Sequence, residues 1–115
     1  MRKVLSIVAW VAAFGAQACA NNSDVDRTLG ARCDVAGDCE QRCLMPSRNT
    51  PGGMCSLSCT KNTDCPGDSV CADREGGICL FPCRADTQCQ FLGAGWFCAD
   101  LEGKDVAKVM ACYGE

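Results

Sequence analysis

Histidine is absent from the 115-residue chain. Without it, a serine or cysteine nucleophile lacks its commonest general base. A lysine or carboxylate base would need a pocket that the few large apolar side chains of this sequence could hardly form. We therefore expect no enzymatic activity, and we assign no catalytic residue.

The C-x2-C spacing is absent as well, although the chain holds 13 cysteines. Zinc sites, iron–sulfur sites and thioredoxin-like redox centres typically need two cysteines on one tight turn, which this spacing provides. The closest pairs here are spaced C-x3-C: Cys39/Cys43, Cys55/Cys59 and Cys79/Cys83. We therefore expect neither a metal site nor a cofactor.

Carboxylates are too few at any one point for calcium. The recurring acids are Asp73 with Glu75 and Asp100 with Glu102. Calcium needs about six to eight converging oxygen ligands, and two carboxylates per turn fall short of that number. We interpret these acids as residues of hairpin turns, where Asp favours the turn conformation and Glu is solvated.

Positive charge and aromatic side chains are also scarce. From residue 21 onward there are 9 Lys or Arg against 14 Asp or Glu. A nucleic-acid partner usually requires a basic patch, so nucleic acid is not an expected partner. The same part of the chain has five aromatic residues, too few to fill a sizeable core: Phe81, Phe91, Trp96, Phe97 and Tyr113.

One apolar run is present, at the start of the chain. Arg2 and Lys3 precede Val4 to Phe14, which are apolar except for Ser6. This pattern predicts a signal peptide over residues 1–18 or 1–20. The run is shorter than a spanning helix needs, and no second apolar stretch follows, so we expect no transmembrane anchor after processing.

The segment GAQACANN leaves two ways for the signal peptide to end. Ala18 and Ala20 fit an ordinary signal peptidase, which would cut after Ala20 and discard Cys19. Alternatively, AQAC resembles a bacterial lipobox, in which Cys19 would receive a lipid and become the new N-terminus. The polar residues that follow favour the lipidated form, because residues 19–32 would then be a flexible tether. Either way, Cys19 leaves the disulfide count.

The remaining twelve cysteines fall into a threefold repeat. The phrases CDVAGDC, CTKNTDC and CRADTQC align, and each begins a set of four cysteines. We place unit 1 at 33–55, unit 2 at 56–79 and unit 3 at 80–115. The sets are Cys33, Cys39, Cys43, Cys55; Cys59, Cys65, Cys71, Cys79; and Cys83, Cys89, Cys98, Cys112.

Such a cysteine content is typical of a disulfide scaffold, in which bridges replace much of the missing core. Each set of four allows three pairings. We prefer first to third and second to fourth, since third to fourth would only close a hairpin that its own ladder already closes. The preferred bridges are Cys33–Cys43, Cys39–Cys55, Cys59–Cys71, Cys65–Cys79, Cys83–Cys98 and Cys89–Cys112.

The turn chemistry predicts a small disulfide-rich fold of short β-hairpins and loops, with little helix apart from the signal peptide. SVCADREGGICL reads as two strands joined by a turn at Arg74 to Gly77, and WFCADLEGKDVAKVMACYG repeats that hairpin with a longer loop. CLMPSRNTPGGMC contains two Pro and two Gly and is predicted to be loop throughout. DVAKVM could form one helical turn.

An insertion in unit 3, QFLGAGWFC, exceeds what a scaffold needs. Its large apolar residues Phe91, Leu92, Trp96 and Phe97 surround two glycines, so a flexible loop could present them to a partner. We favour the other interpretation, that they fold back as a miniature core, because the chain is short of large apolar residues. Replacing Trp96 with alanine separates the two, since loss of folding indicates core and loss of binding alone indicates a contact.

The phrase C-x5-C-x-G-x3-C, followed by a hairpin and a fourth cysteine, resembles the cysteine-rich repeats of exported myxobacterial lipoproteins. More distantly it is similar to the N-terminal cysteine-rich domain of dickkopf proteins. The resemblance spans Cys33 to Cys112 and implies a disulfide architecture without catalytic residues. CTKNTDCPG also looks like part of a whey-acidic-protein inhibitor motif, but the Cys-Cys pair of that motif is missing at Cys71.

We therefore expect a non-enzymatic exported module, anchored to the outer membrane or cell surface if Cys19 is acylated. Its expected partner is a protein or glycan, bound through loops of the scaffold. The alternative function is a secreted protease inhibitor or toxin-like effector.

Overall fold

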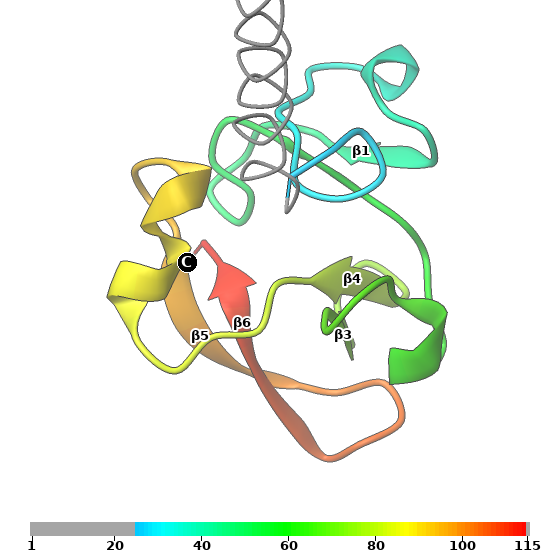
Figure 1. Ribbon diagram of the computed structural model, residues 1–115, viewed down its shortest axis with the longest axis vertical. Helices are drawn as coiled ribbons and strands as arrows, with labels where there is room; N and C mark the ends of the chain where they lie inside the picture. The colour runs from blue at the N-terminus through cyan, green and yellow to red at the C-terminus, as the bar shows by residue number, and fades with distance from the viewer. Residues whose placement is uncertain (1–24, 115) are drawn as a thin grey trace, which may run out of the picture.

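The computed structural model describes residues 25–114, so the expected signal peptide and Cys19 lie outside the described residues. The molecule is a small disulfide-rich protein of three tandem four-cysteine units (Figure 1). In each unit a short 3-10 helix precedes an antiparallel two-stranded hairpin. The elements are η1 Ala36–Asp38, β1 Arg42–Leu44, β2 Met54–Ser56, η2 Asn62–Asp64, β3 Val70–Ala72, β4 Ile78–Leu80, η3 Asp86–Leu92, β5 Phe97–Glu102 and β6 Lys108–Tyr113.

Each hairpin places the third cysteine of its unit directly opposite the fourth. The paired residues are Cys43 and Cys55, Cys71 and Cys79, and Cys98 and Cys112. Directly opposite residues point to the same face of a sheet. Both sulfurs therefore reach toward the loop that carries the first and second cysteines of the unit.

The chain that enters each unit pairs with the free edge of the hairpin. The backbone N–H of the fourth cysteine donates to the carbonyl two residues before the first cysteine. These bonds are Cys55 to Ala31 at 2.7 Å, Cys79 to Leu57 at 3.1 Å and Cys112 to Phe81 at 2.9 Å. The second strand of every hairpin is thus hydrogen-bonded on both edges.

Two glycines allow this close approach. Gly53 and Gly77 stand two residues before the fourth cysteine and have φ values of 79° and 113°. A Cβ at either position would collide with the carbonyl oxygen of Cys33 or Cys59, respectively. Both the left-handed φ and the contact exclude a side chain there.

The units share most of one core. Leu44 and Met54 from unit 1 belong to the same buried cluster as Ile78 from unit 2 and Trp96 from unit 3. The bridges Cys39–Cys55 and Cys33–Cys43 supply a smaller cluster within unit 1. The long β5–β6 hairpin runs beside unit 2, where the Asp73 N–H donates to the Glu102 carbonyl at 2.8 Å (Figure 1).

The packed part of the molecule begins before Cys33. Residues 25–32 were expected to belong to a flexible tether, yet Leu29 is buried in the shared core. The Gly30 N–H donates to the Cys55 carbonyl at 2.9 Å, which continues the edge pairing. The tether prediction is wrong over this stretch. The open edge of β2 and the shared core provide partners for Gly30 and Leu29, and those partners lie far from both residues in the sequence.

Three other local predictions are corrected. Residues 43–55 were expected to be loop throughout, but their ends are strands β1 and β2, so all three units have the hairpin. The expected helical turn over 105–110 is absent, since β6 begins at Lys108. Strand β5 also runs through Asp100 and Glu102, which therefore lie in a strand and not in a turn. Ladder pairing across the longer hairpin overrides these local preferences.

Candidate functional site

Six disulfides hold the units, and each unit joins its first cysteine to the third and its second to the fourth. This is the pairing that we preferred from the sequence. The bridges are Cys33–Cys43, Cys39–Cys55, Cys59–Cys71, Cys65–Cys79, Cys83–Cys98 and Cys89–Cys112.

The two bridges of a unit lie against each other. In each unit, three cysteine sulfurs lie within 4.8 Å of one another. A metal site built from cysteines needs thiolate ligands, and a sulfur in a disulfide is not a thiolate. With the disulfides formed, these cysteines therefore cross-link the chain and do not bind a metal. So many disulfides are typical of proteins that fold in an oxidising environment outside the cytoplasm.

The loop between the first two cysteines is capped in the same way in all three units. The side chain just before the second cysteine accepts the N–H of the residue just after the first. Asp38 accepts from Asp34 at 3.0 Å and Asp64 from Thr60 at 2.9 Å, whereas Gln88 accepts from Arg84 at 2.6 Å. These backbone donors lower the pKa of both Asp carboxyls below the ordinary 3.8.

The insertion in unit 3 divides into core and surface. Leu92 and Trp96 are buried, with 6% and 4% of their surface exposed, whereas Phe91 and Phe97 are about half exposed at 52% and 50%. The Trp96 indole N–H donates to the Pro51 carbonyl of unit 1 at 2.9 Å. Of the four predicted contact residues, Leu92 and Trp96 hold units together, and only Phe91 and Phe97 are available to a partner.

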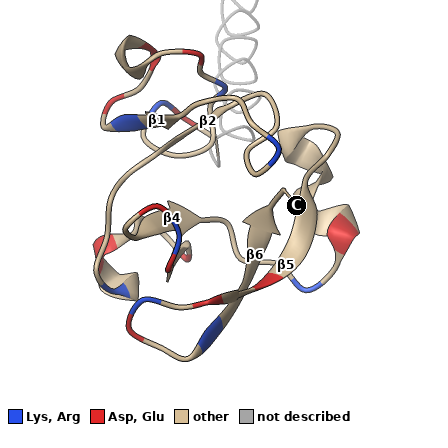
Figure 2. Ribbon diagram, turned by 180° about the vertical axis from the view of Figure 1, so that it is seen from behind, with Lys and Arg blue, Asp and Glu red and all other residues tan. Residues whose placement is uncertain are grey.

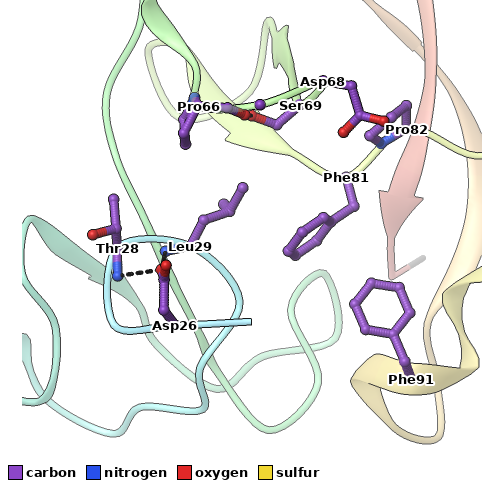
Figure 3. A pocket seen from close by; sticks show the side chains of 10 residues that line it. Asp26, Thr28, Leu29, Pro66, Asp68, Ser69, Phe81, Pro82 and Phe91 are labelled. Carbon is purple, nitrogen blue, oxygen red and sulfur yellow. Dashed lines mark hydrogen bonds between the residues drawn. The ribbon is translucent and has the colours of Figure 1, made fainter. Parts of the chain in front are cut away.

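A cleft opens where units 2 and 3 meet the N-terminal segment that packs on unit 1. Its volume is about 500 Å³, within the usual range for a ligand site. It is lined by the segment before unit 1, by the loop after the second cysteine of unit 2, by the unit 2–unit 3 junction and by η3 (Figure 3). The lining residues are Asp26, Thr28, Leu29, Pro66, Gly67, Asp68, Ser69, Phe81, Pro82 and Phe91.

Two aromatic rings form one wall of the cleft. Phe81 and Phe91 meet edge to face, with ring centroids 5.1 Å apart and ring planes at 80° (Figure 3). Gly30 lies beneath Phe81 with φ 108°, and a Cβ there would approach the ring at 3.0 Å. The absence of a side chain at Gly30 therefore lets the ring settle against the N-terminal segment.

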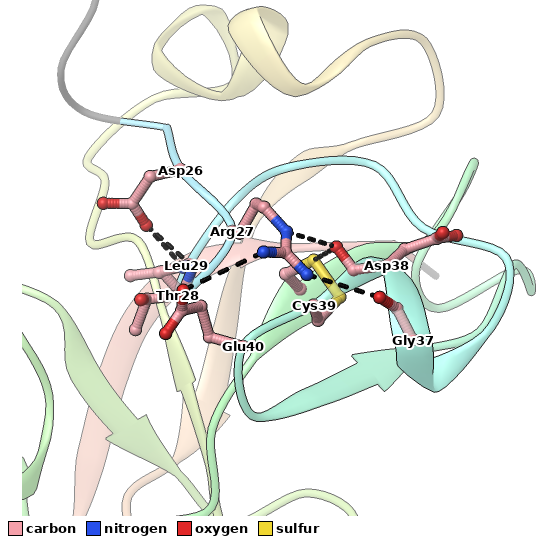
Figure 4. Close-up of polar contacts among 9 residues, drawn as sticks. Asp26, Arg27, Thr28, Leu29, Gly37, Asp38, Cys39 and Glu40 are labelled. Carbon is pink, nitrogen blue, oxygen red and sulfur yellow. Dashed lines mark hydrogen bonds and ion pairs between the residues drawn. A yellow bond between two sulfur atoms is a disulfide. The ribbon is translucent and has the colours of Figure 1, made fainter.

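The opposite wall is held in place by a polar network on unit 1. One Asp26 carboxylate oxygen accepts the N–H groups of Thr28 and Leu29, both at 2.9 Å. The Arg27 guanidinium donates to the Asp38 carbonyl at 3.1 Å and to the Gly37 carbonyl at 3.3 Å (Figure 4). Arg27 thus fastens residues 26–29 to η1, which directs Leu29 and Asp26 toward the cleft.

The charge in the cleft is of one sign. Asp26 and Asp68 are its charged residues, and no Lys or Arg belongs to the lining. Elsewhere, the described Lys and Arg are spread over all three units and are not gathered on one (Figure 2). The cleft therefore combines an aromatic wall with carboxylates.

Sequence reasoning found part of this site. The sequence pattern pointed to Phe91, in the insertion of unit 3, but not to the residues that line the cleft with it. Phe81, Leu29 and Asp68 were missed, because they come from three segments that lie far apart along the chain and meet only when the units pack.

The chain matches no family model, no curated protein and no solved structure. Among residues 25–114, no helix has the length and apolar character that crossing a membrane requires.

Proposed function

We propose that this protein is a non-enzymatic, exported binding module that contacts a protein or glycan. The observation that carries the proposal is the cleft where units 2 and 3 meet the N-terminal segment, with the half-exposed Phe91 at its wall. Disulfides hold the loops that line it, so binding requires little loss of backbone freedom. Aromatic side chains on rigid loops are favourable contact residues.

We further propose that Cys19 anchors the module to the outer membrane or cell surface. The lipobox-like AQAC and the polar residues after it support this proposal. Without lipidation, the same module would be secreted and free to act as an inhibitor or toxin-like effector.

Mass spectrometry of the mature N-terminus tests the anchor. The expected result is a chain that begins at Cys19 and carries the added mass of a lipid. A matched Cys19→Ala variant should lose that mass and leave the membrane fraction. An unmodified chain that begins at Asn21 would disprove the anchor and would favour the secreted form.

Binding is tested with the mature chain, disulfides intact, against immobilised neutral and charged peptides and oligosaccharides. We expect at least one probe to bind, and Phe91→Ala to weaken that binding about fivefold or more. The matched control is Val35→Ala, since Val35 is 56% exposed and lies outside the cleft lining. If no probe binds, or if both variants bind as the parent does, the proposed site is wrong.

A further inference from the structure

We infer that the cleft binds a basic side chain, arginine or lysine, of a partner protein. The inference rests on the proposed binding function and names the chemistry of its ligand. Three features carry it: the aromatic wall, the two carboxylates and the absence of any cation of this chain from the lining.

The aromatic wall suits the aliphatic stem and the cationic head of such a side chain. Phe91 exposes about half of its surface, and its ring lies edge to face with Phe81. The exposed face of a phenyl ring attracts a cation through its quadrupole. Leu29, Pro66 and Pro82 supply apolar surface for the methylene groups of the ligand.

The carboxylates are placed to receive the charge. Asp26 uses one oxygen to cap the Thr28 and Leu29 N–H groups, which fixes the carboxylate and leaves its other oxygen free of bonds among the described residues. Among residues 25–114, no hydrogen bond or ion pair engages the Asp68 carboxylate, which lies on the opposite side of the cleft (Figure 3). A carboxylate with no partner in a partly apolar cleft favours a cationic ligand.

Among residues 25–114, no Lys or Arg belongs to the lining of the cleft. Arg27 is the nearest basic residue in sequence to the lining residue Asp26, and its guanidinium is engaged by η1 and Glu40 (Figure 4). Between Lys3 and Arg27 the sequence has no Lys or Arg, and Arg2 and Lys3 belong to the expected signal peptide. We therefore assign the complementary charge to another molecule.

The partner is a protein chain and not a free amine, because the cleft exceeds one side chain in size. About 500 Å³ accommodates an arginine or lysine together with flanking residues of a peptide. Loops of a folded partner and extended peptides both present such a group. A protein ligand also agrees with the acidic balance of the mature chain, which has 14 acidic and 9 basic residues from residue 21 onward.

The test compares three acetylated, amidated peptides of the form Gly-Ala-X-Leu-Ala-Gly, in which X is arginine, citrulline or glutamate. Citrulline keeps the shape of arginine and removes its charge. Affinities for the disulfide-intact mature chain are measured by calorimetry or by NMR titration. The arginine peptide should bind about fivefold more tightly than the citrulline peptide and should weaken as salt rises from about 0.02 M to about 0.5 M.

The variant Asp68→Asn isolates the role of the carboxylate. We expect it to weaken the arginine peptide about two- to fivefold and to leave the citrulline peptide unchanged. Asp100→Asn is the matched control, since Asp100 is an exposed carboxylate outside the lining. Phe91→Ala should weaken the arginine peptide as well, because the aromatic wall is lost.

The outcomes separate this inference from the function on which it rests. Equal binding of the arginine and citrulline peptides, or arginine binding that neither Asp68→Asn nor Phe91→Ala weakens, overturns the inference. If a neutral or acidic probe then binds in a way that depends on Phe91, the binding function stands and only the ligand class is wrong. If no probe depends on Phe91, both fail.

Discussion

At the scale of the residue, two glycines and one tryptophan decide whether the units form and meet. Gly53 and Gly77 occupy the same place in units 1 and 2, where the chain passes over the carbonyl of the first cysteine. Unit 3 has Met110 at this place, which lacks the positive φ of the two glycines, yet the same edge bond forms: the Cys83 N–H donates to the Met110 carbonyl as the Cys59 N–H donates to that of Gly77. The three units thus agree in the order of their cysteines but differ in the residue two positions before the fourth cysteine.

Gly53→Ala or Gly77→Ala should destabilise the protein by about 2 kcal/mol or more. The added methyl group would face both a left-handed φ and a backbone oxygen that cannot move aside. Chemical denaturation of the disulfide-intact chain measures the change. Gly37→Ala is the control, because a Cβ at Gly37 meets nothing within 4 Å, and its midpoint should change little.

Trp96→Ala should cost about 3–5 kcal/mol, because the side chain is buried between unit 3 and the Pro51 loop of unit 1. Trp96→Phe should cost less, since it keeps much of the buried ring and loses the bond to the Pro51 carbonyl. Thermal unfolding measures both. If the Trp96→Ala variant is as stable as the parent, Trp96 is not a core residue, and the interpretation as a partner contact is favoured.

At the scale of the element, the recurring structure is a capped loop followed by a hairpin. In unit 2 the Asn62 side chain accepts the Cys71 N–H at 2.8 Å, and in unit 3 Asp86 accepts the Cys98 N–H at 2.9 Å. Unit 1 has Ala36 at the corresponding position, so it lacks this second cap. The caps and the bridges together fix the shape of each loop.

Acid should loosen the loops of units 1 and 2 and spare that of unit 3. The folded-state pKa of Asp38 and of Asp64 lies below the ordinary 3.8, chiefly because backbone N–H groups donate to the carboxylates. A lowered pKa means that the stabilisation is present above about pH 3.8 and is lost as pH falls through the folded-state pKa. In unit 3 the side-chain amide of Gln88 accepts the equivalent N–H, and an amide does not titrate.

NMR of the backbone amides between about pH 5 and about pH 2 measures this difference. The amide protons of Asp34 and Thr60 should shift with a pKa below the usual Asp value, and that of Arg84 should not. In Asp64→Asn, where the amide oxygen still accepts the bond, the step at Thr60 should disappear. A step of equal size at Arg84 would contradict the assignment to the capping carboxylates.

At the scale of the whole molecule, the three repeats pack against one another and are not independent domains. The units share a core, and unit 3 is bonded to unit 1 through Trp96 and through the Gly114 N–H, which donates to the Asn49 carbonyl at 2.6 Å. The cleft exists only at their junction. Binding and interunit packing are therefore coupled properties.

Unfolding with intact disulfides should accordingly be a single cooperative transition. Trp96, the one tryptophan after residue 20, reports unit 3 and its contact with unit 1 by fluorescence, and far-ultraviolet circular dichroism reports the whole chain. The two midpoints should coincide. Gly53→Ala in unit 1 should also lower the Trp96 midpoint, and an unchanged Trp96 transition in that variant would mean that the units unfold independently.

Prediction from the sequence succeeded where the interaction is local. The hairpin turn at Arg74 to Gly77 and the cysteine units follow from spacing and turn chemistry, and the structure has the Gly77 N–H donating to the Arg74 carbonyl at 2.8 Å. Prediction was wrong for residues 25–32 and for the ends of the unit 1 loop. The insertion divided between the two interpretations, with Leu92 and Trp96 in the core and Phe91 and Phe97 exposed. Each of these depends on a partner far away in the chain.

The sequence by itself determined the threefold repeat and the disulfide scaffold, because the information lies in cysteine spacing and in turns of a few residues. It favoured the bridges that the structure has without excluding the other pairings within each set of four. Only the tertiary structure decided that residues 25–32 join unit 1, that the aromatic insertion divides into a buried and an exposed half, and that a carboxylate-bearing cleft opens between units. The physical reason is that burial and unfilled space are properties of surfaces brought together by folding. No local pattern encodes which surfaces those are.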